Sequence, residues 1–296
     1  MGGSKDKIIR PRLVGVPRHT EGAVPLFCAM ASMFGARRAM STAALAVLAA
    51  CSPSPVQWVS DRTVQTSAAP EVLASDGVPV PDSLASLRTR MVPPSPVCAG
   101  SLRIARSGAI IFAIWWSPRT DSSALLASAS TKDEGATWTA VAPVDTSDRG
   151  RTGCARNPPS IAADAASGYV HVSYAMLAAE GPGIFFAHSM DGGATFHSPV
   201  PIVYGEVLGR TSVAAAGDLV AVAFEDPNSR TPRIGLALSG TMGHIFEDRL
   251  LPVSDDNGAA THPLVAVQQR RMSVAWQEQG ASSGRVMLHI RTGTIP

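Results

Sequence analysis

Short apolar runs that alternate with polar residues recur between residues 98 and 296. The clearest run, residues 168–176 (GYVHVSYAM), places every second side chain on the same face, which is typical of a strand with one buried face. A short run at 160–163 precedes it, and two more runs, at 184–188 and 199–203, follow it. Turn-forming Gly, Asp and Pro separate the runs. The pattern therefore predicts four antiparallel strands in one sheet.

The same succession of strands is predicted in three other places. The first set comprises residues 102–105, 109–116, 124–130 and 138–143; the third comprises 212–215, 219–224, 234–238 and 250–253; the fourth comprises 264–267, 272–276 and 286–290. The fourth set ends without an outer strand, so we expect a strand from the N-terminal side to complete it and cover its edge. Residues 56–59 and 89–92 are the two candidates.

An aromatic residue near the end of the second strand marks each set. These residues follow one another at intervals of 58, 50 and 52 positions: Trp116, Tyr174, Phe224 and Trp276. Fifteen positions after the first three of them, a polar turn opens at Thr131, Ser189 and Ser239. A four-stranded unit that repeats about every fifty residues suits the blade of a β-propeller.

Two of these turns have nearly the same sequence. Residues 131–138 (TKDEGATW) and 189–196 (SMDGGATF) share the pattern S/T-x-D-x-G-x-T-W/F. The aspartate can accept hydrogen bonds from free backbone N–H groups of the turn. The glycine two positions later supplies a positive φ, and the aromatic residue can pack into the neighbouring sheet. A third turn at 239–246 keeps part of the pattern but has Thr241 in place of the aspartate.

This turn resembles the Asp-box of the sialidase-type (BNR) β-propellers. The resemblance implies an all-β fold of four-stranded antiparallel blades. It also implies a structural role, at the periphery of the blades, for Asp133, Gly135, Trp138, Asp191, Gly193 and Phe196. Four blades are visible; five or six blades, or a truncated ring, remain open. The kelch propellers have a similar period, but their glycine doublet is missing from these strands.

The N-terminal part resembles the signal of a bacterial lipoprotein. Arg37 and Arg38 precede an uncharged run rich in Ala and Leu, and the small residues before Cys51 resemble a lipobox. The alternative is an Ala-rich helix with a buried cysteine. We expect residues 1–50 to be a leader and signal peptide, of which 1–32 is a long leader or reflects a wrongly assigned start. Residues 51–97 would then hold the lipidated Cys51, a linker and the closing strand, and 98–296 the propeller.

Export changes the interpretation of the remaining cysteines. Cys98 and Cys154 precede the inner strands of the first and second predicted blades at nearly equivalent positions. Such positions lie near the axis of a propeller, and an oxidising compartment favours a disulfide between them over two independent buried thiols.

Composition excludes several classes of function. The mature part has no basic block with interleaved aromatics, so we expect no nucleic-acid partner. The histidines are scattered and the sequence contains no P-loop, HExxH or CxxC motif, so we expect no cofactor and no metal. No long apolar run follows the signal, so only the lipid on Cys51 would hold the protein to a bacterial outer membrane or cell surface.

The resemblance raises the question of catalysis. Sialidases clamp a substrate carboxylate with arginines and use a tyrosine nucleophile with a glutamate and an acid. The candidates here are Asp121, Tyr204 and Glu225 for catalysis, and Arg119, Arg156, Arg210 and His262 for ligand binding. Their positions depart from the family pattern, because no arginine precedes the first predicted inner strand, where Cys98 stands, and His262 replaces a third arginine. We therefore expect a non-catalytic propeller that binds a glycan or an envelope protein, with an exo-sialidase-like hydrolase and an envelope assembly factor as alternatives.

Overall fold

The computed structural model describes residues 54–65, 96–255, 258–280 and 285–296. The chain divides into two units, Met1–Ser52 and Pro53–Pro296, and all described residues belong to the second. The leader, Cys51 and the candidate strand at 89–92 lie outside the described residues. In the part of the chain that is described, no helix has the length and apolarity needed to span a bilayer.

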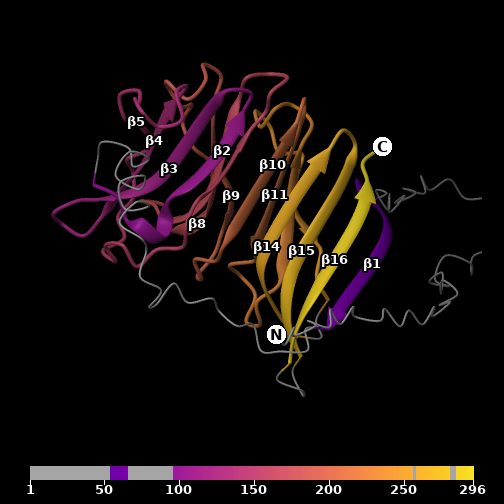
Figure 1. Cartoon of the computed structure of the whole chain (residues 1–296). Coiled ribbons are helices and arrows are strands. Elements are labelled where there is room, and N and C mark those ends of the chain that lie inside the picture. Colours follow the sequence, from indigo (N-terminus) through magenta and orange to yellow (C-terminus); the bar gives the residue numbers. More distant parts are fainter. Residues whose placement is uncertain (1–53, 66–95, 256–257, 281–284) are drawn as a thin grey trace, which may run out of the picture. The chain divides into compact units, whose positions relative to one another are not determined.

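The described unit is built from four sheets of four antiparallel strands each (Figure 1). The first sheet follows a short 3-10 helix, Ala99–Ser101, and holds β2 (Arg103–Ser107), β3 (Ile110–Pro118), β4 (Ala124–Thr131) and β5 (Ala142–Asp145). The second holds β6 (Ser160–Ala163), β7 (Val170–Leu177), β8 (Pro182–Ser189) and β9 (Val200–Tyr204). The third holds β10 (Thr211–Ala216), β11 (Leu219–Glu225), β12 (Ile234–Ser239) and β13 (Asp248–Pro252).

The fourth sheet joins segments from both ends of the described unit. It holds β14 (Gly258–Gln268), β15 (Arg271–Gly280) and β16 (Val286–Thr294), and β1 (Gln57–Gln65) pairs antiparallel with β16 as its outermost strand. Residues 56–59, one of the two expected closing segments, thus lie at the start of this strand. Pairing of β1 covers the edge that β16 would otherwise expose.

The four sheets are blades of a β-propeller. The inner strand of each sheet contacts the inner strand of the next: β2 lies against β6, β6 against β10, and β10 against β14. The large aromatic side chains of the second strands fill the layers between blades: Trp116 and Tyr174 share one cluster, and Phe224 shares another with Phe186. The predicted fold class is therefore confirmed, and most predicted strands are observed within a few residues, although β14 begins six residues before its predicted start at 264. The first outer strand was predicted too early, since β5 begins only at Ala142.

The two similar turns are held as the sequence predicts. Asp133 accepts hydrogen bonds from the backbone N–H of Thr137 at 2.8 Å and from the hydroxyl of Thr131 at 2.7 Å. Asp191 accepts the same two bonds from Thr195 and Ser189. Hydrogen bonds from Thr137 and then Thr131 lower the pKa of Asp133 to about 2. These carboxylates thus stabilise the turn through hydrogen bonds.

The third turn uses a hydroxyl where the other two use a carboxylate. Thr241 accepts a hydrogen bond from the backbone N–H of Ile245 at 2.9 Å through its side-chain oxygen. Ser239 accepts one from the N–H of Gly243 at 3.0 Å, as the first residue does in the other two turns. Gly243 has a φ of +87°, and a Cβ there would lie 2.5 Å from the ring of Phe186. This close approach brings the third turn against the second blade.

A disulfide joins the first two blades. Cys98 and Cys154 are bonded, with their Cα atoms 5.2 Å apart. Cys98 precedes β2 and Cys154 precedes β6, so the disulfide links the segments that lead into two inner strands. The predicted pairing is confirmed.

Candidate functional site

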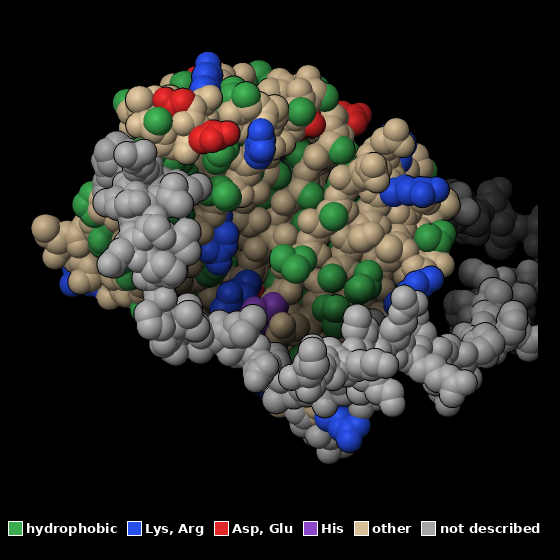
Figure 2. Space-filling view, in the orientation of Figure 1, with side chains coloured by type: hydrophobic (Ala, Val, Ile, Leu, Met, Phe, Trp, Pro, Cys, Tyr) green, Lys and Arg blue, Asp and Glu red, His purple; other side chains and the backbone are tan. Residues whose placement is uncertain are grey.

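A cavity of about 410 Å³ lies where the inner strands of the four blades meet. It is lined by β2, β6, β10 and β14 or by residues next to them, and by β15 and β16 of the fourth blade. Figure 2 looks into this hollow, where arginine and histidine side chains gather beside an apolar sheet face. The lining residues are Arg103, Ile104, Pro158, Pro159, Ser160, Ile161, Arg210, Thr211, Ser212, His262, Pro263, Leu264, Ala275, Trp276, Gln277 and Leu288.

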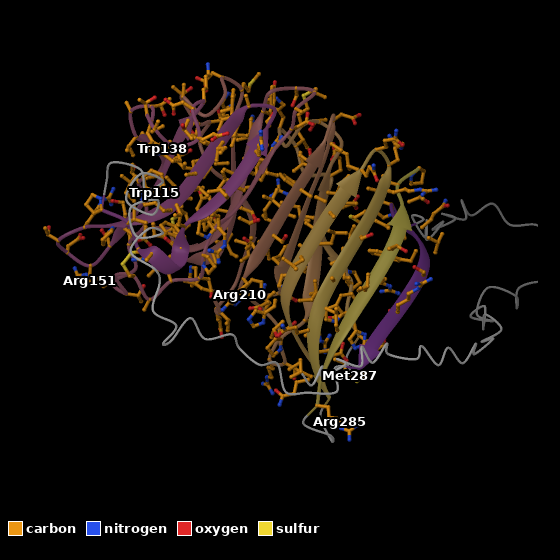
Figure 3. All side chains as sticks on the ribbon, in the orientation of Figure 1. Trp115, Trp138, Arg151, Arg210, Arg285 and Met287 are labelled. Atoms are coloured by element: carbon orange, nitrogen blue, oxygen red, sulfur yellow. A yellow bond between two sulfur atoms is a disulfide. The ribbon has the colours of Figure 1, made fainter. Side chains whose placement is uncertain are left out.

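Three cationic or titratable groups face this cavity from three blades. Arg103 opens β2, Arg210 directly precedes β10 (Figure 3), and His262 lies in β14. Burial lowers the pKa of Arg103, and the positive charge of Arg210 lowers it further. Burial and Arg210 also lower the pKa of His262, although Glu225 opposes them. The guanidinium of Arg210 therefore lies close enough to Arg103 and to His262 to disfavour the charged form of each.

Glu225 fixes the backbone on two sides of the cavity. One of its carboxylate oxygens accepts the backbone N–H of Arg210 at 3.0 Å, and the other accepts the N–H of His262 at 2.9 Å. His262 has a φ of +56°, an uncommon value for a residue with a side chain. Glu225 thus links the third blade to the fourth and holds both cavity residues in place. This use of its oxygens is structural, and the residue does not line the cavity.

Arg156 lies in a buried network and not in the cavity lining. It forms a bidentate ion pair with Asp148, at 2.9 and 2.8 Å, and the two side chains are 6% and 0% exposed. Its remaining N–H groups donate to backbone carbonyls at Gly150, Gly153 and Ser122. The guanidinium also lies 5.6 Å from the ring centre of Trp116. Each of its three nitrogens thus donates to a partner within or between the first two blades.

Arg119 and Asp121 lie in the exposed loop between β3 and β4. Arg119 donates to the carbonyl of Thr146 at 3.2 Å. Asp121 accepts two hydrogen bonds from Ser123, which lower the pKa of its carboxyl group. Neither residue lines the cavity, so the fold does not bring them to Arg210 and His262.

Tyr204 is far along the blade from the cavity. It ends the outer strand β9, is 42% exposed, and packs edge-on against Phe185. The other two tyrosines are engaged elsewhere, Tyr174 with Asp145 at 2.6 Å and Tyr169 with a histidine cluster. All three tyrosines of the chain lie in its described part, and none lines the cavity.

Arg103 was missed by the sequence analysis. It stands in the predicted first inner strand, residues 102–105. Only the residues that precede each inner strand were considered, and in the first blade that residue was Cys98. The exposed apolar side chains in the cavity were missed as well: Ile104 is 60% exposed and Leu264 is 66% exposed. An inner strand of a propeller turns one face to the central hollow, and the sequence pattern does not mark that face.

Comparisons with known proteins yield only remote similarity. No protein-family model matches the chain, and no curated protein sequence matches it. Among solved structures, it is similar to a protein of unknown function from Dyadobacter fermentans (17% identity, TM-score 0.49, covering 63% of this chain and 50% of that one). It is also similar to a Hadza microbial sialidase (16% identity, TM-score 0.43, covering 61% of this chain and 42% of that one). A third similar structure is a PL25 ulvan lyase (13% identity, TM-score 0.44, covering 66% of this chain and 50% of that one). The chain spans about half the length of these proteins, and similarity at this level assigns no activity to it.

Proposed function

We propose that the protein is a surface-anchored propeller that binds an anionic glycan in the cavity of Arg103, Arg210 and His262, without transforming it. The observation that carries the proposal is the charge of this cavity. In the described part of the chain, no carboxylate lies within ion-pair distance of either guanidinium, and Arg103 donates only to the backbone carbonyls of Gly100 and Leu102. Two such arginines favour a carboxylate or sulfate, which accepts hydrogen bonds from both.

The apolar lining supports a sugar as the carrier of this anionic group. Ile104 and Leu264 flank the arginines and expose most of their side chains, and Thr211 and Gln277 add neutral polar groups. A ring with one C–H face and several hydroxyls would contact both kinds of side chain. Binding sites of this kind combine an apolar surface with a few convergent polar groups.

Binding is favoured over hydrolysis by the positions of the catalytic candidates. A sialidase mechanism needs a tyrosine, a glutamate and an acid around the scissile bond. Tyr204 and Asp121 lie on other surfaces, and both oxygens of Glu225 accept backbone N–H groups. An exo-sialidase-like hydrolase is therefore the second candidate, and a scaffold that binds an envelope protein is the third.

The anchoring to a bacterial outer membrane or cell surface rests on the lipobox-like sequence before Cys51. The disulfide is consistent with export, because such bonds persist in oxidising compartments. The hydrogen-bonded turns at Asp133 and Asp191 support their assignment as Asp-boxes, since both carboxylates accept the same set of bonds.

Titration calorimetry on the full chain with N-acetylneuraminic acid, glucuronic acid and glucose tests this proposal. We expect the acids to bind and glucose to bind at least tenfold more weakly. Arg210→Ala should weaken binding of the acids by roughly 10- to 100-fold, since a charge-assisted hydrogen bond contributes about 1.5–3 kcal/mol. Arg106→Ala is the matched control, because Arg106 lies on the same strand as Arg103 but outside the cavity.

Two results would contradict the proposal. Equal binding of glucose and the acids, or equal affinity of the Arg210→Ala variant, would remove the role of the charged cavity. Turnover of a fluorogenic sialoside that disappears in Arg210→Ala would replace the binding proposal by the hydrolase.

A further inference from the structure

Three histidines that are scattered in the sequence meet at the junction of the second and third blades. His188 is the residue before the last of β8, His197 follows the turn of Asp191, and His244 lies within the turn that Thr241 holds. We propose that His188, His197 and His244 bind one divalent transition-metal ion, with Zn²⁺ as the expected metal, and so link the two blades. This site is separate from the cavity of Arg103, Arg210 and His262.

The geometry of the three rings fits a shared ion. Each histidine offers one ring nitrogen, and these three atoms all lie within 4.8 Å of one another. The ring centres of His197 and His244 each lie 4.6 Å from that of His188. Nitrogens that bind one tetrahedral Zn²⁺ at about 2.0–2.1 Å are separated by about 3.4 Å. His197 and His244 are exposed, so small rotations of their side chains would bring the three nitrogens to that spacing.

The backbone holds the ligands on a fixed frame. The N–H of His197 donates to the carbonyl of His188 at 2.9 Å, so the segment after the turn of Asp191 lies beside the end of β8. His244 is brought to them by Gly243, which packs against Phe186 where any Cβ would collide. The ring of Tyr169 stacks parallel to that of His188. Ligands that are positioned before the metal arrives reduce the cost of forming the site.

A buried polar atom provides an independent indication. His188 is 3% exposed, and its Nε2 has no hydrogen-bond partner within the described ranges. Buried polar atoms of native proteins are nearly always paired with protein, water or an ion, because an unpaired one is destabilising. An ion at this position would complete the coordination that the protein groups leave open.

The donor set determines the class of metal. Imidazole nitrogens suit Zn²⁺, Cu²⁺ and Ni²⁺, whereas Ca²⁺ and Mg²⁺ prefer oxygen ligands. Three histidines from two neighbouring blades leave a fourth position, which water would fill. The ion would thus tie the turn of the third blade to the strand β8 of the second.

The test is the binding of Zn²⁺ to the untagged full chain after chelator treatment and removal of the chelator. Calorimetry should show one ion per chain, and Co²⁺ in place of Zn²⁺ should give the visible absorption of a tetrahedral site. Zn²⁺ should also raise the melting temperature. His197→Ala and His244→Ala change exposed residues and should fold, but each should weaken binding by about 100-fold or more, since even the loss of an outer-shell partner costs 10- to 100-fold.

His289→Gln is the matched control, because His289 stacks on Trp276 in the fourth blade, away from the three ligands. It should bind Zn²⁺ like the unmodified chain. The proposal is overturned if the unmodified chain takes up no Zn²⁺ at micromolar concentration, or if His197→Ala and His244→Ala bind it with unchanged affinity. Sugar binding does not depend on this site, so either proposal can fail without the other.

Discussion

Arg156 and Arg210 both precede inner strands, in adjacent blades, and the protein uses them in opposite ways. Both come shortly before an inner strand, Arg156 before β6 and Arg210 before β10. The guanidinium of Arg156 is enclosed by Asp148, three carbonyls and the ring of Trp116. The guanidinium of Arg210 lines an open cavity beside Arg103 and His262. The same residue type is structural in one blade and available to a ligand in the next.

The difference comes from the carboxylates near each arginine. Asp148 is buried and directs both oxygens to the guanidinium of Arg156 and to backbone N–H groups. Beside Arg210, the two oxygens of Glu225 accept the backbone N–H groups of Arg210 and His262. The acid that would neutralise Arg210 is thus used to shape the cavity. A binding site arises where the fold supplies cations and assigns the nearby anion to the backbone.

The largest effect is expected from Arg156→Ala. It leaves the carboxylate of Asp148 buried without its partner, which should lower the free energy of unfolding by about 3–5 kcal/mol. Chemical denaturation of the full chain measures this change, and Arg151→Ala, an exposed neighbour (Figure 3), should change stability by less than about 0.5 kcal/mol. If the folded Arg156→Ala protein loses sugar binding at unchanged stability, the contrast with Arg210 is wrong.

Removal of the disulfide should have the next largest effect. Cys98 and Cys154 are separated by 56 positions, and a bond that closes a loop of this size typically stabilises a fold by about 2–5 kcal/mol. Cys98→Ser with Cys154→Ser should lower the denaturation midpoint and weaken the packing around Arg156. A reductant should then have no further effect on the variant. An equal midpoint for the variant and the oxidised chain would show that the bond does not restrain the blades.

Glu225→Gln tests the other side of the comparison. An amide has one acceptor oxygen, so one of the two backbone N–H groups loses its partner, at a cost of about 1–3 kcal/mol. We expect lower stability and weaker binding of N-acetylneuraminic acid, because Arg210 and His262 are no longer held together. Glu206→Gln, at an exposed position after β9, is the control. Unchanged binding in Glu225→Gln would mean that the carboxylate does not shape the cavity.

The smallest effect concerns the protonation of His262. Its pKa is lowered from 6.5 by burial and by Arg210, so it titrates at lower pH in the folded chain than in the unfolded one. The unfolded state therefore takes up a proton first as the pH falls below 6.5, and the histidine disfavours the folded state in that range. NMR titration should show the pKa of His262 rising in Arg210→Ala and remaining the same in Arg156→Ala. If the pKa of His262 is the same in the unmodified chain and in both variants, Arg210 lies too far from His262 to affect its protonation.

The same titration predicts how pH affects the ligand. A protonated His262 adds positive charge to the cavity, so the affinity for an acidic sugar should rise as the pH falls through the pKa of His262. By linkage, the bound acid should raise that pKa. Calorimetry at several pH values above the pKa of the sugar measures this, and an affinity that falls with decreasing pH would contradict it.

The repeat could be predicted from the sequence because the strands of one blade lie close together in the chain. Except for β1, which pairs with β16, each strand pairs with its neighbours in the sequence, so alternation, turn residues and the spacing from Trp116 to Trp276 were sufficient to place these strands. The turns of Asp133 and Asp191 were predictable for the same reason, since all their partners lie within four positions. Arg103 and the cluster of His188, His197 and His244 were not, because their members lie in different blades or different turns.

The sequence alone thus determined the four-stranded blades, the hydrogen-bonded turns and the pairing of Cys98 with Cys154. These features depend on short-range hydrogen bonds and on a regular period, which a single chain displays directly. The tertiary structure decided which arginine is free and which is paired, and it brought three distant histidines within reach of one ion. Those outcomes depend on distances between blades, and the electrostatic partner of a side chain is set by such distances rather than by its position in the chain.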